Sequence, residues 1–278
     1  MKLSNNTLYI VSTPIGNLDD ITIRAITVLK KSDIILCEDT RHSLKLLNHL
    51  KLKKKMVSYH KFNEKKQTPN IIEQIKQGKI LSLISDAGTP LLSDPGKILI
   101  NECIKNKINL VPIPGASSIT AGMSISGFKD QFLFFGFLPK KENELEKALK
   151  SISTLPFSLI FFSPAVKLKF YLRKFKTFFS GRKILIAKEI TKIYESYHRG
   201  DIDDLDSFKN DMRGELTIVI SEPKPKLKKE NVDVPIKIIN KVKNYLKKYS
   251  VKDTVELISN SERVSKKIIY KLCLELKK

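Results

Sequence analysis

Short apolar runs that alternate with helical patterns restrict the fold of this chain more than any other feature of its sequence. The expected strands of the first part are Leu8–Ser12, Asp33–Cys37, Met56–Tyr59, Ile80–Ser85 and Asn109–Pro112. The helical patterns between them cover Ile21–Lys31, Arg41–Leu50, Pro69–Gln77 and Pro95–Lys105. Because strands that are separated by helices pair in parallel, this order predicts an α/β fold with a largely parallel sheet covered by helices on both faces.

A second α/β series begins after Pro114-Gly115. Its expected strands are Phe132–Phe137, Phe157–Phe162, Lys183–Lys188, Ile193–His198 and Glu215–Ser221. Its expected helices are Glu142–Ser151, Val166–Phe178 and Ile202–Asp211. The two strands on either side of Thr191 follow each other without a helix, which predicts a mixed sheet. We therefore expect an N-terminal α/β domain at residues 1–116 and a second α/β domain at residues 117–222.

The last fifth of the chain has a different character. Prolines and like charges predict a linker at residues 223–234, because proline denies ladder hydrogen bonds and like charges repel. Helical periodicity follows at Pro235–Tyr249, Lys252–Ser259 and Val264–Leu276. This pattern predicts a basic helical domain at residues 235–278 that resembles a helix-turn-helix, with Ser250 as a helix cap.

The basic charge has two explanations that the sequence leaves open. The formal net charge is +22, and residues 223–278 carry +10 of it, from 16 basic and 6 acidic side chains. Lysines outnumber arginines by 44 to 7, and the codon usage of an A+T-rich genome is enough to produce that excess. A polyanionic partner is the other explanation, and the clustering of basic residues in the tail favours it.

Several protein classes are excluded by what the sequence lacks. No apolar run approaches the roughly 20 residues of a membrane-spanning helix, and the strand-like run at Leu8 leaves no room for a signal peptide. Cys37, Cys103 and Cys273 have neither CxxC nor metal-ligand spacing, so we expect reduced thiols and no metal site. Walker, Rossmann, zincin and hydrolase signatures are missing as well. We expect a cytoplasmic protein without a membrane segment.

Three loops of small residues directly follow expected strands, at Ser12–Asn17, Ser85–Gly96 and Pro112–Ser118. Open α/β sheets bind ligands at the carboxyl ends of their strands, and glycine lets the backbone approach a ligand closely. Each loop could be an ordinary turn, but the middle one carries two carboxylates, two prolines and two glycines, more than a turn requires. Together the three predict a ligand crevice, with the middle loop on the surface.

Eight motifs, in order, resemble the small-subunit rRNA methyltransferase I subfamily of the tetrapyrrole-methylase-fold methyltransferases. They are Thr13–Leu18, Cys37–Arg41, Tyr59-His60 with Asn63-Glu64, Ser85–Pro90, Pro114–Ser117, Phe135–Pro139, Lys188–Lys192 and Arg213–Glu215. The resemblance covers residues 7 to 221, and the basic helical tail also matches that subfamily.

The resemblance implies two α/β domains with S-adenosylmethionine bound in the cleft between them. It implies transfer of a methyl group to the ribose 2′-oxygen of a cytidine in the decoding centre of 16S rRNA, within the small ribosomal subunit, by a homodimer. The residues that it implies for the cofactor are Pro14, Ile15, Gly16, Asp86, Ala87, Gly88, Thr89, Pro90, Leu92, Ser117, Ser118, Phe162, Lys188, Glu189 and Ile190.

The ribose hydroxyl is a poor nucleophile, so a base that takes its proton would help the transfer. The candidate bases are Glu38, Asp39, His60, Glu64 and Glu189. Each could instead cap a helix or pair with a neighbour, and proton loss to water or phosphate without any base is a further alternative. Arg41 is assigned to ribose or phosphate contact, because a guanidinium matches phosphate geometry.

Basic residues also flank the segment Tyr59–Glu64, namely Lys51, Lys53, Lys54, Lys55, Lys61, Lys65 and Lys66. They are either solvated surface or a binding surface for rRNA phosphates. In the second case Tyr59, His60 and Phe62 are available to stack on an unpaired base.

Two other functions remain open. One is methylation of a tetrapyrrole or corrinoid, against which the basic tail and the lysine-rich segment argue, since a small macrocycle requires neither. The other is a non-catalytic rRNA-binding assembly factor that keeps the cofactor pocket as a scaffold. The intact loop Ser85–Pro90 argues against that function.

Overall fold

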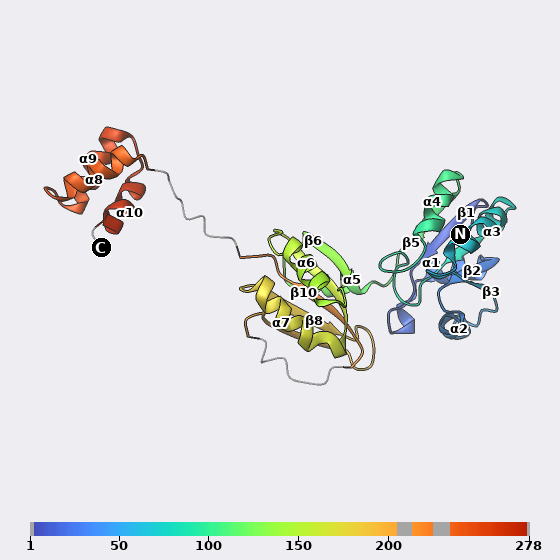
Figure 1. Cartoon of the computed structure of the whole chain (residues 1–278). Coiled ribbons are helices and arrows are strands. Elements are labelled where there is room, and N and C mark those ends of the chain that lie inside the picture. The colour runs from blue at the N-terminus through green and yellow to red at the C-terminus, as the bar shows by residue number, and fades with distance from the viewer. Residues whose placement is uncertain (1–2, 205–212, 225–233, 277–278) are drawn as a thin grey trace. The chain divides into compact units, whose positions relative to one another are not determined.

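A computed structural model describes residues 3–204, 213–224 and 234–276 of the chain. These residues fall into two units, 1–224 and 225–278. The first unit contains two five-stranded sheets, and the second contains three helices (Figure 1). The predicted α/β class with a helical C-terminal piece is therefore confirmed.

The first sheet is entirely parallel and has the strand order β3-β2-β4-β1-β5. Its strands are β1 (Thr7–Val11), β2 (Ile34–Cys37), β3 (Lys55–Ser58), β4 (Leu81–Leu83) and β5 (Asn109–Ile113). Since all five point the same way, the loops that follow them gather at one edge of the sheet. The three small-residue loops come after β1, β4 and β5, the three neighbouring strands at one side of the order.

Helices cover both faces of this sheet, as predicted. They are α1 (Ile23–Lys31), α2 (Thr40–His49), α3 (Glu64–Lys76) and α4 (Lys97–Lys105). Successive residues of β1 serve different cores: Leu8 packs with Ile71 and Leu99, whereas Tyr9 packs with Val28 and Leu47. A strand that is buried on both faces reads as a continuous apolar run, which is why these strands were visible in the sequence.

Helix α3 begins earlier than predicted and contains Pro69 in its interior. Proline favours the first turn of a helix, and this preference placed the expected start too late. Pro69 lies on the exposed side, while Thr68, Ile71 and Ile75 are buried. The burial of that apolar side therefore outweighs the one intrahelical hydrogen bond that proline removes.

The second sheet is mixed, as predicted, with the order β6-β7-β10-β8-β9. Its strands are β6 (Phe132–Phe137), β7 (Ser158–Pro164), β8 (Lys183–Lys188), β9 (Ser196–Asp201) and β10 (Glu215–Ile220). Only β6 and β7 pair in parallel. Its helices are α5 (Ser118–Ser124), α6 (Glu142–Ile152) and α7 (Leu168–Phe179). The described part of the first unit also has two 3-10 turns, η1 (Leu18–Asp20) and η2 (Ala165–Lys167).

Two predictions for the second series need correction or comment. The strand expected at Ile193–His198 begins only at Ser196, because the chain turns before it. Glu189 and Thr191 have positive φ values of 50° and 67° in that turn. A helix was expected at Ile202–Asp211. Residues 202–203 form a turn, and the part of the expected helix from residue 205 on lies outside the described residues.

The second unit consists of α8 (Ile236–Leu246), α9 (Val251–Glu262) and α10 (Lys266–Leu276). It has a core of its own, formed by Ile238, Val242, Val255, Ile258, Ile269 and Cys273. The predicted cap is confirmed: Ser250 Oγ accepts a hydrogen bond from the Asp253 N–H at 3.2 Å. Among the described residues, no helix combines the length and the apolar character that crossing a membrane requires.

Candidate active site

The three small-residue loops at the edge of the parallel sheet are fastened to one another. Thr13 and Gly88 exchange two backbone hydrogen bonds, of 2.9 and 3.1 Å. The Ser12 and Thr89 hydroxyls are 3.0 Å apart. A Cβ on Gly115 would lie 2.9 Å from Ser12 Cβ, so glycine is what lets the third loop approach the first. The loops therefore form one rigid wall.

The middle loop is more buried than the sequence suggested. Gly88 is buried, and its φ of +76° is a backbone conformation that residues with a side chain rarely adopt. Ser85 Oγ lies 3.2 Å from both the Ala87 and the Gly88 carbonyl oxygens and can donate its hydrogen bond to either of them. The expected surface loop is therefore exposed only in part: Ala87, Leu92 and Ser93 are exposed, whereas Gly88, which pairs with Thr13, and Pro90 are buried.

The opposite wall comes from the second sheet. Thr217 of β10 pairs directly with Phe162 of β7 on one side and with Ala187 of β8 on the other. Directly paired residues share a face of the sheet, so these three form one row. Phe134 and Phe137 pack edge-on against Phe162, with ring centroids 5.0 and 5.4 Å away. The row is therefore a firm, mostly apolar surface.

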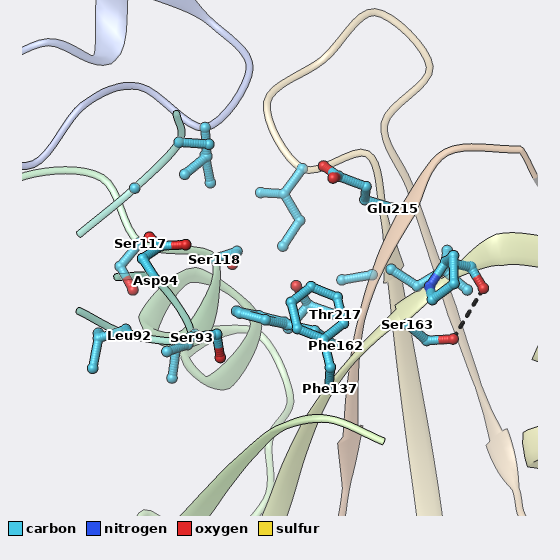
Figure 2. Close-up of a pocket in the computed structure, with 18 of the residues that line it drawn as sticks. Leu92, Ser93, Asp94, Ser117, Ser118, Phe137, Phe162, Ser163, Glu215 and Thr217 are labelled. Carbon is cyan, nitrogen blue, oxygen red and sulfur yellow. Dashed lines mark hydrogen bonds between the residues drawn. The ribbon is translucent and has the colours of Figure 1, made fainter. Parts of the chain in front are cut away.

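A cavity of about 580 Å³ lies between the loops and this row (Figure 2). We call it the first cavity. The cofactor residues predicted from the resemblance that line it are Ile15, Asp86, Ala87, Gly88, Thr89, Leu92, Ser117, Ser118, Phe162, Glu189 and Ile190. The other four, Pro14, Gly16, Pro90 and Lys188, are not part of its lining.

Gly16 lies where the first loop contacts the turn before β9. A Cβ at this position would be 2.5 Å from Lys192 Cγ and 2.7 Å from Thr191 Oγ1. The neighbouring Asn17 N–H donates to Thr191 Oγ1 at 3.0 Å. Gly16 therefore permits the close contact that joins the two walls beside the cavity.

Several lining residues were not predicted, among them Ser93, Asp94, Phe137, Tyr171, Lys192, Glu215 and Thr217. Figure 2 shows Ser93 and Asp94 across the cavity from Thr217 and Phe162. One signal was present in the sequence: Thr217 is a polar residue inside the buried apolar run of β10. No sequence pattern separates Asp94 from an ordinary loop carboxylate.

Three carboxylates line the first cavity on the side of the parallel sheet: Glu38, Asp86 and Asp94. Burial, together with the nearby Glu38 and Asp86 charges and against a hydrogen bond from Ser85, raises the pKa of Asp94 to about 6. Burial also raises the pKa of Glu38, with Asp86 adding to the effect. The carboxylates on this wall repel one another when they are ionised, so a positively charged ligand bound beside them would be stabilised.

A second cavity of about 480 Å³ adjoins the first. It is lined by Glu38, Asp39, Thr40, Arg41, Ser58, His60, Lys61, Phe62 and Asp86. Glu38 and Asp86 belong to both linings and so form the boundary between the two cavities. Three of the five predicted bases, Glu38, Asp39 and His60, are brought together here with Arg41, the residue predicted to contact ribose or phosphate.

The candidate bases differ in how far their atoms are already engaged. Asp39 accepts hydrogen bonds from the Arg41 side chain at 2.8 and 3.1 Å, and this pairing lowers the pKa of Asp39. His60 Nδ1 accepts from the Phe62 N–H at 3.2 Å. Within the described part of the chain, the Glu38 carboxylate has no hydrogen-bond partner.

Glu64 and Glu189 hold the backbone in place. Glu64 Oε2 accepts from the Gly96 N–H at 3.2 Å, and Glu64 lines neither cavity. Glu189 Oε1 accepts from the Glu215 N–H at 2.9 Å and from Lys192 Nζ at 3.0 Å. Both carboxylates are thus committed to contacts that position the loops.

The prediction that Tyr59 is available for stacking is wrong. Its side chain is fully buried, and its hydroxyl lies 2.9 Å from Thr68 Oγ1. Phe62, by contrast, is 94% exposed beside the second cavity. The in-and-out alternation of strand residues does not predict this difference between Tyr59 and Phe62, because both residues come after β3 ends. Tyr59 turns inward and packs against α3.

Two solved methyltransferases share the fold of this chain. The methyltransferase CobJ is 16% identical, with a TM-score of 0.59 over 78% of this chain and 94% of that one. The uroporphyrin-III C-methyltransferase from Thermus thermophilus, solved in complex with S-adenyl homocysteine, is 14% identical, with a TM-score of 0.55 over 78% of this chain and 97% of that one. The fold is that of the tetrapyrrole methylase class.

The family model for tetrapyrrole (corrin/porphyrin) methylases matches residues 7–206. Proteins called ribosomal RNA small subunit methyltransferase I are similar over most of the chain. The one from Mesomycoplasma conjunctivae is 44% identical over 81% of this chain and 94% of its own length. The one from Escherichia coli O157:H7 is 33% identical over 98% of this chain and 96% of its own.

A third relative of that name, from Thermotoga maritima, is 40% identical over 77% of this chain and 97% of its own length. That relative therefore has no counterpart to roughly a fifth of these residues. The chain belongs to the tetrapyrrole methylase family and, within it, to the ribosomal RNA small subunit methyltransferase I proteins.

Proposed function

We propose that this chain transfers a methyl group from S-adenosylmethionine to the ribose 2′-oxygen of a cytidine in 16S rRNA. The observation that carries the proposal is the first cavity, in a chain whose relatives at 33–44% identity are called ribosomal RNA small subunit methyltransferase I. The acceptor atom and nucleotide rest on the motif resemblance to that subfamily.

The first cavity suits such a donor in size and chemistry. Its volume of about 580 Å³ falls inside the range of roughly 300–1,000 Å³ that small-molecule pockets have. The Phe162–Thr217–Ala187 row offers an apolar surface for adenosine, and the Gly88 turn lets the loop backbone come close to a ligand. We assign to the donor the eleven predicted residues that line this cavity, with Pro14, Gly16, Pro90 and Lys188 shaping the walls behind them.

S-adenosylmethionine supplies a methyl group on a positively charged sulfur. The work of the protein is to hold the acceptor oxygen in line with that methyl group and to keep water away. The apolar row and the fastened loops provide rigid walls for this. Asp86, Asp94 and Glu38 place negative charge on one wall, where it stabilises a cationic donor without needing to reorganise.

We further propose the small ribosomal subunit as the source of the rRNA, a homodimer as the working form and the cytoplasm as the location. The charge of +22 and the lysines around Tyr59–Glu64 support an RNA partner. Ile193 and Tyr194, which are 94% and 75% exposed just before the edge strand β9, support pairing with a second copy. The proposed domain limits stay at 1–116, 117–222, 223–234 and 235–278.

The test is to incubate the protein with isotope-labelled S-adenosylmethionine and either small ribosomal subunits or bare 16S rRNA. Mass spectrometry of the nucleosides should then find labelled 2′-O-methylcytidine. A filled-cavity variant, Ala87→Phe, is the control, because Ala87 is an exposed residue of the first cavity's lining. It should lose donor binding in calorimetry and keep its melting temperature.

Other products would overturn the proposal. A label on a cytidine base, or on a tetrapyrrole or corrinoid supplied in the same assay, would assign a different acceptor. Donor binding with no transfer to any of these substrates would favour the assembly-factor alternative.

A further inference from the structure

The second cavity has a composition that the donor does not need. An exposed phenyl ring, a guanidinium and an ammonium (Phe62, Arg41 and Lys61) stand at its rim, and two carboxylates (Glu38 and Asp86) lie at its boundary with the first cavity. Aromatic, cationic and hydrogen-bonding groups in one depression match the three parts of a nucleotide: its base, its phosphate and its sugar.

We propose that the second cavity receives the target nucleotide turned out of the RNA, with its ribose at the Glu38–Asp86 boundary. This inference rests on the proposed function, because it names where the acceptor of that reaction binds. The cavity volume of about 480 Å³ is enough for one nucleotide and small for a folded RNA element. The acceptor must therefore leave its neighbours, as nucleotides do when enzymes modify them.

The base is assigned to Phe62. Its side chain is 94% exposed, with only an edge contact to His60, ring centroids 6.1 Å apart. A phenylalanine this exposed gains little from packing within the folded chain, whereas stacking a base on it removes both surfaces from water. Base–aromatic stacking of this kind contributes substantially to binding of single-stranded RNA and tolerates any base.

The phosphate is assigned to Arg41 and Lys61. Asp39 accepts from Arg41 Nε and Nη2 at 3.1 and 2.8 Å, which fixes the plane of the guanidinium. The Arg41 side chain is nevertheless 89% exposed, so its remaining N–H groups face solvent. A guanidinium held in this way presents donors that match a phosphate, and Lys61 adds a second positive charge.

Glu38 is assigned to the ribose hydroxyl. It is the one predicted base that lines both cavities, and its carboxylate has no hydrogen-bond partner in the described part of the chain. Asp86, the other shared carboxylate, accepts from the Asp39 N–H at 3.3 Å and is thereby held in place. Burial and the Asp86 charge raise the pKa of Glu38, against the opposing effect of His60, and a raised pKa makes a carboxylate a better proton acceptor near neutral pH.

In the transfer step the proton of the 2′-hydroxyl passes to the Glu38 carboxylate while the ribose oxygen bonds to the donor methyl carbon. The carbon–sulfur bond breaks, and its electron pair stays on sulfur, which becomes neutral. Glu38 then returns the proton to solvent through the open side of the second cavity.

The experiment compares methyl transfer to small subunits by Phe62→Ala, Phe62→Tyr, Lys61→Ala and Glu38→Gln. Phe62→Ala should raise the KM for RNA by about tenfold or more, and Phe62→Tyr, which keeps a ring, should restore it. Glu38→Gln should lower kcat at least about 100-fold with RNA affinity retained. The controls are Ile104→Ala, which shortens an exposed apolar side chain of α4, and Lys30→Ala, which removes an exposed charge from α1.

The proposal is overturned if Phe62→Ala and Lys61→Ala show the same KM as the two controls, or if Glu38→Gln keeps its kcat. Failure of the proposed function is read separately, as absence of 2′-O-methylcytidine with the unaltered protein. Binding of a fluorescent single-stranded RNA that contains cytidine needs no turnover. If Phe62→Ala and the unaltered protein bind this RNA with equal affinity, the nucleotide does not bind in the second cavity, whether or not methyl transfer is detected.

Discussion

At the scale of single residues, Asp94 is a partly buried carboxylate in the first cavity whose ionisation costs folding stability. Its pKa rises from 3.8 to about 6 because it is buried near Glu38 and Asp86. An acid with a raised pKa costs stability whenever it must ionise in the folded protein. Such a cost is tolerated where the charge has a use, and a cationic donor in the first cavity would provide one.

Asp94→Asn should therefore stabilise the free protein at neutral pH. The folded chain binds more protons than the unfolded chain between pH 3.8 and about 6, so its stability falls as pH rises through this window and then stays level. Removing the ionisation should raise the free energy of unfolding by about 1–2 kcal/mol at pH 7.5, allowing for the partial exposure of Asp94, and by much less near pH 4.

Urea unfolding at several pH values measures this difference. Asp130→Asn, at an exposed position next to β6, is the matched control. A stabilisation by Asp94→Asn that is the same at every pH would mean that the Asp94 charge is not what costs the stability.

At the scale of elements, the contact between the first loop and the turn of residues 189–192 joins the two walls of the first cavity. In this turn Glu189 and Thr191 have positive φ values. An ion pair of 3.0 Å between the Glu189 and Lys192 side chains holds the turn together. Gly16 lies directly against this turn. The Thr191 and Lys192 side chains lie directly against the backbone at Gly16 and Asn17, so the spacing of the walls depends on the absence of a side chain at Gly16.

Gly16→Ala should disturb that spacing. Its φ is not positive, so alanine fits the local backbone, but the new methyl group would lie 3.0 Å from the Ile190 carbonyl oxygen as well as against Lys192. The crowding should lower the free energy of unfolding by about 1–3 kcal/mol. Misplaced walls should lower kcat/KM by roughly 10- to 100-fold.

A thermal melt and the kinetics of methyl transfer measure these two effects, and calorimetry with S-adenosylmethionine measures the donor affinity separately. Unchanged donor affinity at a lowered melting temperature would show that the contact serves folding and not the geometry of the cavity.

At the scale of the whole molecule, the helices of the tail form a compact unit of their own. Its three helices enclose their own core, and the chain divides between Lys224 and Pro225. The Thermotoga maritima relative matches over 97% of its own length with 77% of this chain, so a protein of this family exists without that much sequence. Residues 223–278 carry +10 of the +22 net charge, which suits a sequence-independent hold on rRNA.

Truncation after Lys224 should leave the first unit folded with its donor affinity nearly intact. The KM for small subunits should rise strongly at physiological salt, because phosphate contacts release counterions and those contacts would be lost. The kcat at saturating substrate should fall less, since the tail contributes binding that the ground and transition states share.

The slope of log Kd for rRNA against log salt decides between this hypothesis and a structural role. The truncated form should have the flatter slope. Equal slopes with an earlier melt would assign the tail to packing against another part of the protein.

Much of the fold was predictable because its signals are local. Strands buried on both faces appear as apolar runs, and a polar residue such as Ser250 marks the start of a helix by its own hydrogen bond. The positions of the three loops follow from the same reasoning, since each comes directly after a strand. The interior Pro69 of α3 was missed because packing of the apolar side of the helix overrode the local preference. The late start of β9 was missed because a turn takes up the first residues of the expected strand.

The sequence by itself determined the α/β order, the mixed second sheet, the separate basic tail and the loops that line the first cavity. The tertiary structure alone decided which loop residues face that cavity, that Gly88 and Tyr59 are buried, and that Asp94 and Thr217 belong to the site. It also placed Glu38 at the boundary of two cavities and Gly16 against Lys192. These outcomes depend on contacts between residues far apart in the chain, and periodicity and local hydrogen bonding carry no information about such contacts.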